Sequence, residues 1–154
     1  MKILFISLAI IALLIVAVGF MLGIKSKQSP PLGLVAGHLR NCPASPNCVS
    51  SETEKNDTAH YIKPIPIRDG KAWAKIVTAI ENLGGHIVVN DGQYLHATFI
   101  SALFRYIDDV EARLDASERV IHLRSASRVG HSDLGANRRR LESLRRALAI
   151  APLP

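Results

Sequence analysis

The side chains that could do chemistry in this 154-residue chain are concentrated in its last third. Asp109 and Glu111 stand at alternate positions of one run, and His122, Arg124 and Arg128 follow in the next. An arginine fork binds a carboxylate or a phosphate through two parallel hydrogen bonds, and a neighbouring carboxylate can hold the guanidinium group in place. The combination therefore predicts either an ion-paired surface or a site for a small anion.

The two runs are predicted to be consecutive antiparallel strands. A turn over residues 115–118 would place Asp109 opposite Arg124, and Glu111 opposite His122. In this register the apolar residues sort onto the other face of the sheet, which supports it, because a slip of one residue would scramble both faces.

Seven residues are candidates for binding, from both strands and from the segment that follows them: Asp109, Glu111, His122, Arg124, Arg128, Asn137 and Arg138. Three interpretations stay open. The first is an exposed sheet face with weak cross-strand ion pairs, and the second is a site for an anion or small ligand. The third is a hydrolase-like enzyme in which Asp109, Glu111 and His122 transfer protons.

A structural clasp would explain the same residues without any ligand. Asn137 could brace the loop before it, and Arg138 could pin the last helix to the strand that contains Asp108 and Asp109. The sequence contains no nucleophile elbow, phosphate-binding loop or zinc signature. We therefore assign it no catalytic residue, no metal ligand and no cofactor.

Hydrophobic periodicity and turn residues predict the elements that must position these side chains. They are a weak edge strand over 61–67, a helix over 69–83, a hairpin over 86–90 and 93–100, strands over 104–114 and 119–127, and a helix that begins near Asp133. The polar run 50–59 is expected to form an exposed loop. This order predicts an α+β fold, a two-layer sandwich of an antiparallel sheet with two helices on one face.

The N-terminal segment is predicted to be a transmembrane anchor over residues 1–25, followed by a linker over 26–38 that is too polar and broken to pack, and by one domain over 39–150. Residues 3–24 contain Ser7 as their one polar side chain and would form a helix of about 33 Å, enough for a hydrocarbon core of about 30 Å. A cleaved secretory signal is the alternative, although its apolar stretch is usually shorter. Lysines flank both ends, so charge does not decide the orientation.

The chain has two cysteines, Cys42 and Cys48, in a loop with two prolines and an asparagine. Such a loop permits a disulfide without requiring it, and two free thiols are the alternative. A zinc site is not expected, because two further ligands at a suitable spacing are missing from the sequence.

The formal net charge of +6 overstates the basicity of the domain. Without Lys2, Lys25 and Lys27, 16 basic and 13 acidic residues remain, a net charge of +3. The excess lies in the C-terminal helix, which we predict to be a solvated face, with contact to anionic lipid headgroups as the alternative. This helix lacks interleaved aromatic residues, so nucleic-acid binding is not expected.

The charged segments and the cysteine loop together resemble the domain of unknown function 1499 family. The matching segments are residues 41–51, 104–111, 124–130 and 132–140, in that order along the chain. Leu134 departs slightly, because an aromatic residue would fit equally well there. The resemblance carries over no catalytic residue. It implies a compact domain, chiefly bacterial, behind an export signal or membrane anchor, and it favours an extracytoplasmic domain with a Cys42–Cys48 bridge.

The sequence thus predicts a single-pass membrane protein whose domain lies on the periplasmic face of the inner membrane. We expect a non-enzymatic module that binds a small anion, a lipid headgroup or a partner protein. The hydrolase-like enzyme stays the alternative.

Overall fold

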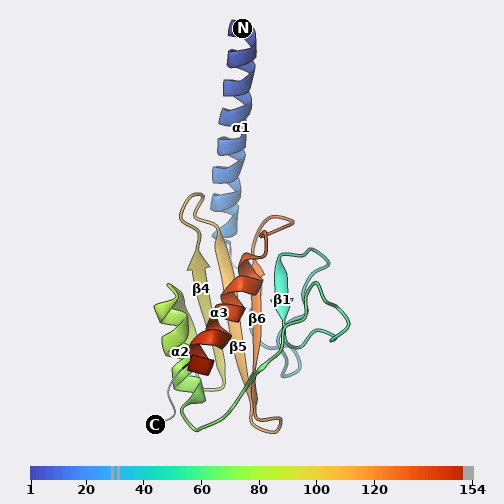
Figure 1. Cartoon of the computed structure of the whole chain (residues 1–154), viewed down its shortest axis with the longest axis vertical. Coiled ribbons are helices and arrows are strands. Elements are labelled where there is room, and N and C mark those ends of the chain that lie inside the picture. The colour runs from blue at the N-terminus through green and yellow to red at the C-terminus, as the bar shows by residue number, and fades with distance from the viewer. Residues whose placement is uncertain (29, 31, 151–154) are drawn as a thin grey trace.

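The computed structural model describes residues 1–28, 30 and 32–150. The helices are α1 (Lys2–Ser26), α2 (Ala72–Asn82) and α3 (Ala136–Ile150), and the strands are β1 (Cys48–Ser50), β2 (Ile65–Pro66), β3 (His86–Asn90), β4 (Tyr94–Ile100), β5 (Ile107–Asp115) and β6 (Val120–Ser127). The strands form one antiparallel sheet in the order β1-β6-β5-β4-β3, and β2 also pairs with β6. In Figure 1, α2 and α3 cover one face of this sheet, and α1 extends away from one end of it. The predicted α+β sandwich is confirmed.

The hydrophobic core lies between the sheet and the two covering helices. Alternate residues of the central strands, such as Leu95, Val110 and Leu123, are fully buried and meet Ile80 of α2 and Leu144 of α3. This alternation is the period of two that a sheet with one apolar face requires. The opposite face of the sheet, which we call the polar face, carries the intervening residues.

The predicted register between β5 and β6 is wrong by two residues. Glu111 lies opposite Arg124, and Asp109 lies opposite Ala126. The turn occupies 116–119 instead of 115–118, because the carboxylate of Asp115 accepts hydrogen bonds from the backbone amides of residues 117 and 118 and closes the loop one position later. A shift of two positions leaves every side chain on its predicted face, since the side-chain period is two.

Both covering helices begin slightly later than the sequence predicts. Asp133 caps α3 as expected, with its carboxylate accepting hydrogen bonds from the amides of Gly135 (2.9 Å) and Asn137 (2.7 Å). Asp69 binds the amide of Lys71 at 2.9 Å in the turn before α2. Carboxylates at these positions satisfy amides that have no partner inside a helix.

The cysteine loop is closed by a disulfide between Cys42 and Cys48, whose Cα atoms are 5.6 Å apart. Cys48 is fully buried and begins β1, a strand that the sequence did not predict. Because β1 pairs with β6, the disulfide fastens the loop to the edge of the sheet next to the charged strands.

Replacing both cysteines by alanine should lower the free energy of unfolding by about 2 kcal/mol, because the short loop is no longer closed in the unfolded chain. Urea unfolding of the full-length protein in non-ionic detergent measures the change. Reduction of the wild type is the control and should give the same midpoint. An unchanged midpoint in both would contradict a stabilising role for the bridge.

Candidate functional site

Three buried carboxylates on or beside the polar face are each paired with an arginine. The pairs are Asp109 with Arg128, Glu111 with Arg124, and Glu52 with Arg113. The carboxylates are 2%, 0% and 9% exposed at the side chain, so water cannot solvate them to any large extent. Buried ionised groups of this kind need charged partners and hydrogen bonds to remain in the folded state.

Asp109 is held from two sides. The guanidinium of Arg128 binds both of its oxygens, at 2.8 and 2.7 Å, and Nε2 of His96 lies 2.8 Å from Oδ1. Burial raises the pKa of the Asp109 carboxyl, but the hydrogen bonds from Arg128 and His96 outweigh burial and leave the pKa below its ordinary value. Arg128 also donates to the backbone carbonyl of Ser26, at the end of α1, over 3.3 Å.

Glu111 is fully buried and has three donors. The Tyr94 hydroxyl donates at 2.7 Å, Arg124 at 2.9 Å and the backbone amide of Gly33 at 3.2 Å. Burial and the bond to Glu111 both raise the pKa of the Tyr94 hydroxyl, so Tyr94 stays protonated and acts as a donor. Nε of Arg124 is buried and finds no hydrogen-bond partner within the described part of the chain.

Glu52 is a site residue that sequence reasoning missed. Its carboxylate accepts hydrogen bonds from Arg113, from the amide of Leu39 and from His38. Burial raises the pKa of Glu52, but these partners, Arg113 foremost, leave it lowered. The polar run 50–59 gave no periodic signal. The one sequence clue was Arg113, a charged residue at the alternate position that follows Asp109 and Glu111 on the same face of the strand.

The described residues from Ser26, the last residue of α1, to Leu39 contact the polar face, whereas a linker that does not pack was expected. Ser26 meets Arg128, Gly33 meets Glu111 and Leu39 meets Glu52. We call this segment, residues 26–28, 30 and 32–39, the strap. Backbone amides in a segment without secondary structure are not used in helix or sheet hydrogen bonds, so they can donate to carboxylates instead. Any molecule that approached Glu111 would have to displace the strap.

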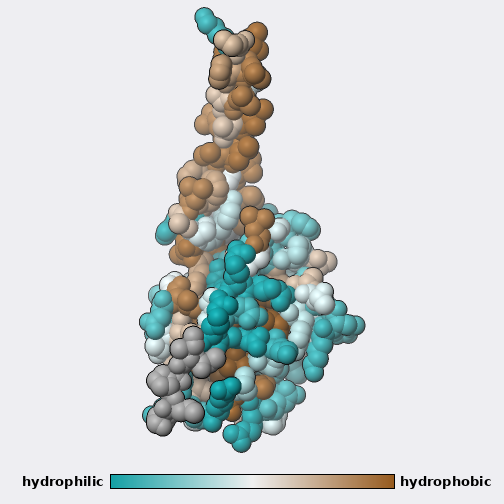
Figure 2. Space-filling view, in the orientation of Figure 1, coloured by the Kyte–Doolittle hydropathy of each residue, from teal (hydrophilic) through white to brown (hydrophobic). Residues whose placement is uncertain are grey.

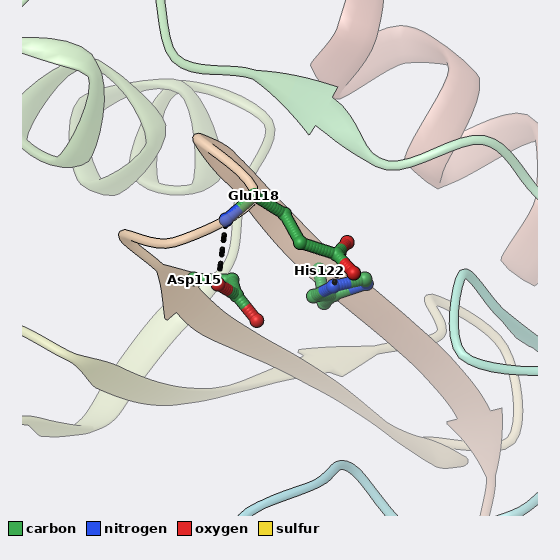
Figure 3. Close-up of side chains that lie close together, drawn as sticks. All are labelled: Asp115, Glu118 and His122. Carbon is green, nitrogen blue, oxygen red and sulfur yellow. Dashed lines mark hydrogen bonds and ion pairs between the residues drawn. The ribbon is translucent and has the colours of Figure 1, made fainter.

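His122 lies at the other end of the polar face, opposite Arg113. Figure 3 shows it near Glu118 and Asp115 of the β5–β6 turn, and ligand-type atoms of the three lie within 4.8 Å of one another. Burial lowers the pKa of His122, so its imidazole is largely neutral near pH 7. However, Arg113 donates to Asp115 at 3.1 Å and the turn engages the other oxygen of Asp115. A guanidinium in that position opposes a second cation, so we assign no metal to this cluster.

Asn137 lies on the opposite side of the sheet from these ion pairs, on the face that α3 covers. It is fully buried, accepts from the Ser125 hydroxyl at 2.6 Å and donates to the carbonyl of Asn47 at 2.9 Å. The clasp between α3 and β5 exists, but Arg140 makes it, binding Asp108 at 2.8 Å.

The assignment of the clasp to Arg138 is therefore wrong. Arg140 is three positions after Asn137 and shares its helix face, whereas Arg138 points elsewhere. Arg138 donates to the carbonyls of Thr58 and Ala59, at the end of the polar run, and of Tyr61 just after it.

A pocket of about 300 Å³ lies where the polar face meets the end of α1. Its lining comes from α1, the cysteine loop, the last residue of β6 and the segment after β6: Leu22, Lys25, Pro43, Ser45, Asn47, Ser127, Arg128, Val129 and Gly130. Asn47 donates to the carbonyl of Gly130 at 2.6 Å, which ties two of its walls together. Lys25 and Arg128 give the pocket a positive character that suits an anionic group.

The seven predicted residues therefore do not form one open site. The structure joins Asp109 to Arg128 and Glu111 to Arg124, places His122 at the far end of the face, and puts Asn137 and Arg138 on α3. Of the seven, Arg128 alone lines the pocket. Asp109 and Glu111 are already fully engaged, so their geometry favours a structural role over proton transfer.

Fold and site define an α+β sandwich with an internal row of ion pairs, attached to a long apolar helix. The sequence profile described as "Protein of unknown function (DUF1499)" matches residues 38–148, and the chain belongs to that family. No curated protein and no solved structure gave a match.

The buried pairs lead to a prediction about stability. Arg124→Met should lower the free energy of unfolding by about 3–5 kcal/mol, because it leaves the Glu111 carboxylate buried without its counter-charge. Adding Glu111→Gln should restore part of the loss, since the neutral amide oxygen can still accept from Tyr94. Chemical denaturation measures both.

The control is Arg145→Met, because Arg145 pairs with Glu142 at 3.5 Å on a more exposed part of α3. Its loss should stay below about 1 kcal/mol. Equal losses for the two arginines would contradict a stabilising role for the buried row.

A second prediction concerns pH. The lowered pKa of Asp109 means that its carboxylate adds stability above the unfolded-state value of 3.8, and that this stability is lost as the pH falls through the folded-state pKa. Asp109→Asn should therefore reduce the free energy of unfolding at pH 7. Between about pH 5 and pH 2, this variant should lose less of that free energy than the wild type does. Part of the pH dependence of stability should remain in this variant, because the pKa of Glu52 is lowered as well.

Urea titrations over a pH series measure this difference, with Glu142→Gln on α3, a carboxylate outside the polar face, as the control variant. If Asp109→Asn had the same slope as the wild type, the ion pair with Arg128 would not be the source of the acid sensitivity.

Proposed function

We propose that this protein is a membrane-anchored, non-enzymatic module that binds the anionic headgroup of a lipid in the pocket beside α1. The observation that carries the proposal is the position of that pocket. Its walls include Leu22 and Lys25, from the last turns of a helix that is long and apolar enough to cross a membrane.

The anchoring rests on α1 itself. The helix has 25 residues, a mean hydropathy of 3.1 and 6% of its apolar window buried. Figure 2 shows its surface as almost continuously hydrophobic where it leaves the domain. A bare apolar helix of this length is far more stable in a bilayer than in water.

The charges of the pocket select an anion. Arg128 is fixed by Asp109, which offsets its charge. Lys25, which forms no ion pair within the described part of the chain, supplies the remaining positive charge. The pocket lies beside the polar end of α1, the depth at which headgroup phosphates lie around a spanning helix. An anionic lipid is therefore the anion present at highest local concentration, and Leu22 offers an apolar edge for its acyl chains.

The disulfide supports an oxidising compartment for the domain, because such bridges persist in secreted and periplasmic proteins and are rare in a reducing cytosol. We accordingly place the domain on the extracytoplasmic side, with the periplasmic face of the inner membrane as the specific setting.

Native mass spectrometry of the full-length protein, released gently from membranes, tests the proposal. The wild type should carry a bound anionic phospholipid, and Lys25→Gln should bind it about fivefold more weakly, the effect of one lysine near an anionic surface. Lys27→Gln is the matched control, because Lys27 is exposed and does not line the pocket. A bare wild type, or equal losses in both variants, would overturn specific binding in this pocket.

A further inference from the structure

The loop between β4 and β5, residues 101–106, packs along the side of α1. Gly19 and Gly23 face it, and a Cβ atom at Gly19 would lie only 2.5 Å from the ring of Phe104. At Gly23 the backbone carbonyl of Phe104 takes the space of a side chain. Two glycines spaced by four on one helix face allow this close approach. The loop therefore reaches back along α1, past the point where the helix ends.

Aromatic rings fill the contact. Phe20 and Phe104 meet edge to face at 5.7 Å, and Phe104 stacks on Tyr106 at 5.6 Å. The loop is closed on itself, since the Ser101 amide donates to the Tyr106 carbonyl and the Tyr106 amide to the Ser101 hydroxyl, both at 2.9 Å. At the boundary between headgroups and hydrocarbon, backbone groups are stable when they are hydrogen-bonded within the protein, and aromatic rings are favoured there.

The helix geometry gives the depth of this loop. The uncharged stretch 3–24 spans about 33 Å against a hydrocarbon core of about 30 Å, so its ends lie close to the two boundaries. Gly19 is five residues before the end of the stretch, which puts it about 6 Å below the nearer boundary when α1 spans the bilayer. Phe104, in contact with Gly19, lies at a similar depth.

Two exposed leucines mark the same end of the domain. Leu103 is 72% exposed in the β4–β5 loop, and Leu134 is 85% exposed in the loop before α3. In Figure 1 both loops lie at the end of the sheet from which α1 emerges, one on either side of the helix. Leu134 has φ of 52°, a left-handed conformation that costs a branched side chain energy and here points an apolar group into solvent.

We propose that Leu103, Phe104 and Leu134 insert into the bilayer at the headgroup–hydrocarbon boundary and form a second membrane contact beside α1. This inference rests on the proposed anchoring of α1, but not on lipid binding in the pocket. The domain then has one orientation on the membrane, with the polar pocket held at headgroup depth. Arg105, exposed between Phe104 and Tyr106, extends toward the headgroups.

Quenching of tryptophan by brominated lipids tests the insertion. The full-length protein carries one tryptophan, Trp73, which is changed to phenylalanine so that an added tryptophan is the only probe. Leu103→Trp and Leu134→Trp are compared with Leu14→Trp in the middle of α1 and with Ala116→Trp in the turn at the opposite end of β5. Each variant is placed in phosphatidylcholine vesicles brominated near the carbonyl end or near the middle of the acyl chain.

Leu103→Trp and Leu134→Trp should each lose about half of their fluorescence in vesicles with the shallow bromines, as interfacial residues do. Leu14→Trp should be quenched most by the deep bromines, and Ala116→Trp by neither. If the Trp73→Phe background lowers the melting temperature, the same substitutions are made in the wild type and the signal of Trp73 is subtracted.

The outcomes separate the two proposals. Quenching of Leu14→Trp without quenching at 103 and 134 would overturn the loop insertion, and would point to a protein partner for the leucines, while the anchor stands. No quenching of Leu14→Trp would overturn the anchor, and the insertion with it. If mass spectrometry showed no bound lipid while the tryptophan at position 103 was quenched as expected, only the proposal of lipid binding in the pocket would be overturned.

Discussion

The burial of two carboxylates on β5 is the constraint on which the rest of this structure depends. Asp109 and Glu111 lie on the face of the sheet that the helices do not cover, yet they are 2% and 0% exposed. Ionised groups in that position are stable only when every oxygen has a donor. The neighbouring strands therefore supply Arg124 from β6 and Tyr94 from β4, each aimed at Glu111.

The same constraint explains why the strap contacts the polar face. Once the neighbouring strands have contributed their side chains, Glu111 still accepts the backbone amide of Gly33, and Arg128 reaches the carbonyl of Ser26. The strap closes the polar face and removes it from water, which strengthens each ion pair beneath it. Its first residue also ties the end of α1 to Arg128, which follows β6, so the anchor and the domain are joined by contacts as well as by the chain.

The sequence predicted correctly those features that depend on residues close together along the chain. Alternation assigned Asp109, Glu111 and Arg124 to one face, and capping by Asp133 located the last helix. The pairing across β5 and β6 was wrong because it depended on the side chain of Asp115, which closes the turn one residue later than the pattern suggested. Glu52 and the strap were missed for another reason, since their partners are distant in sequence and nothing periodic marks them.

Arg128 belongs both to the buried ion pairs and to the lining of the pocket. Its hydrogen bonds differ in strength, and this difference determines which of them an anion in the pocket would replace. Its Nε and one terminal nitrogen hold Asp109 at 2.8 and 2.7 Å, whereas the other donates to Ser26 at 3.3 Å. An anion in the pocket would compete for the weaker bond and leave the ion pair intact, because charge-assisted bonds to a carboxylate are stronger than a long bond to a carbonyl. Headgroup binding would then act on the last turn of α1, at the point where the strap begins, without disturbing the core of the polar face.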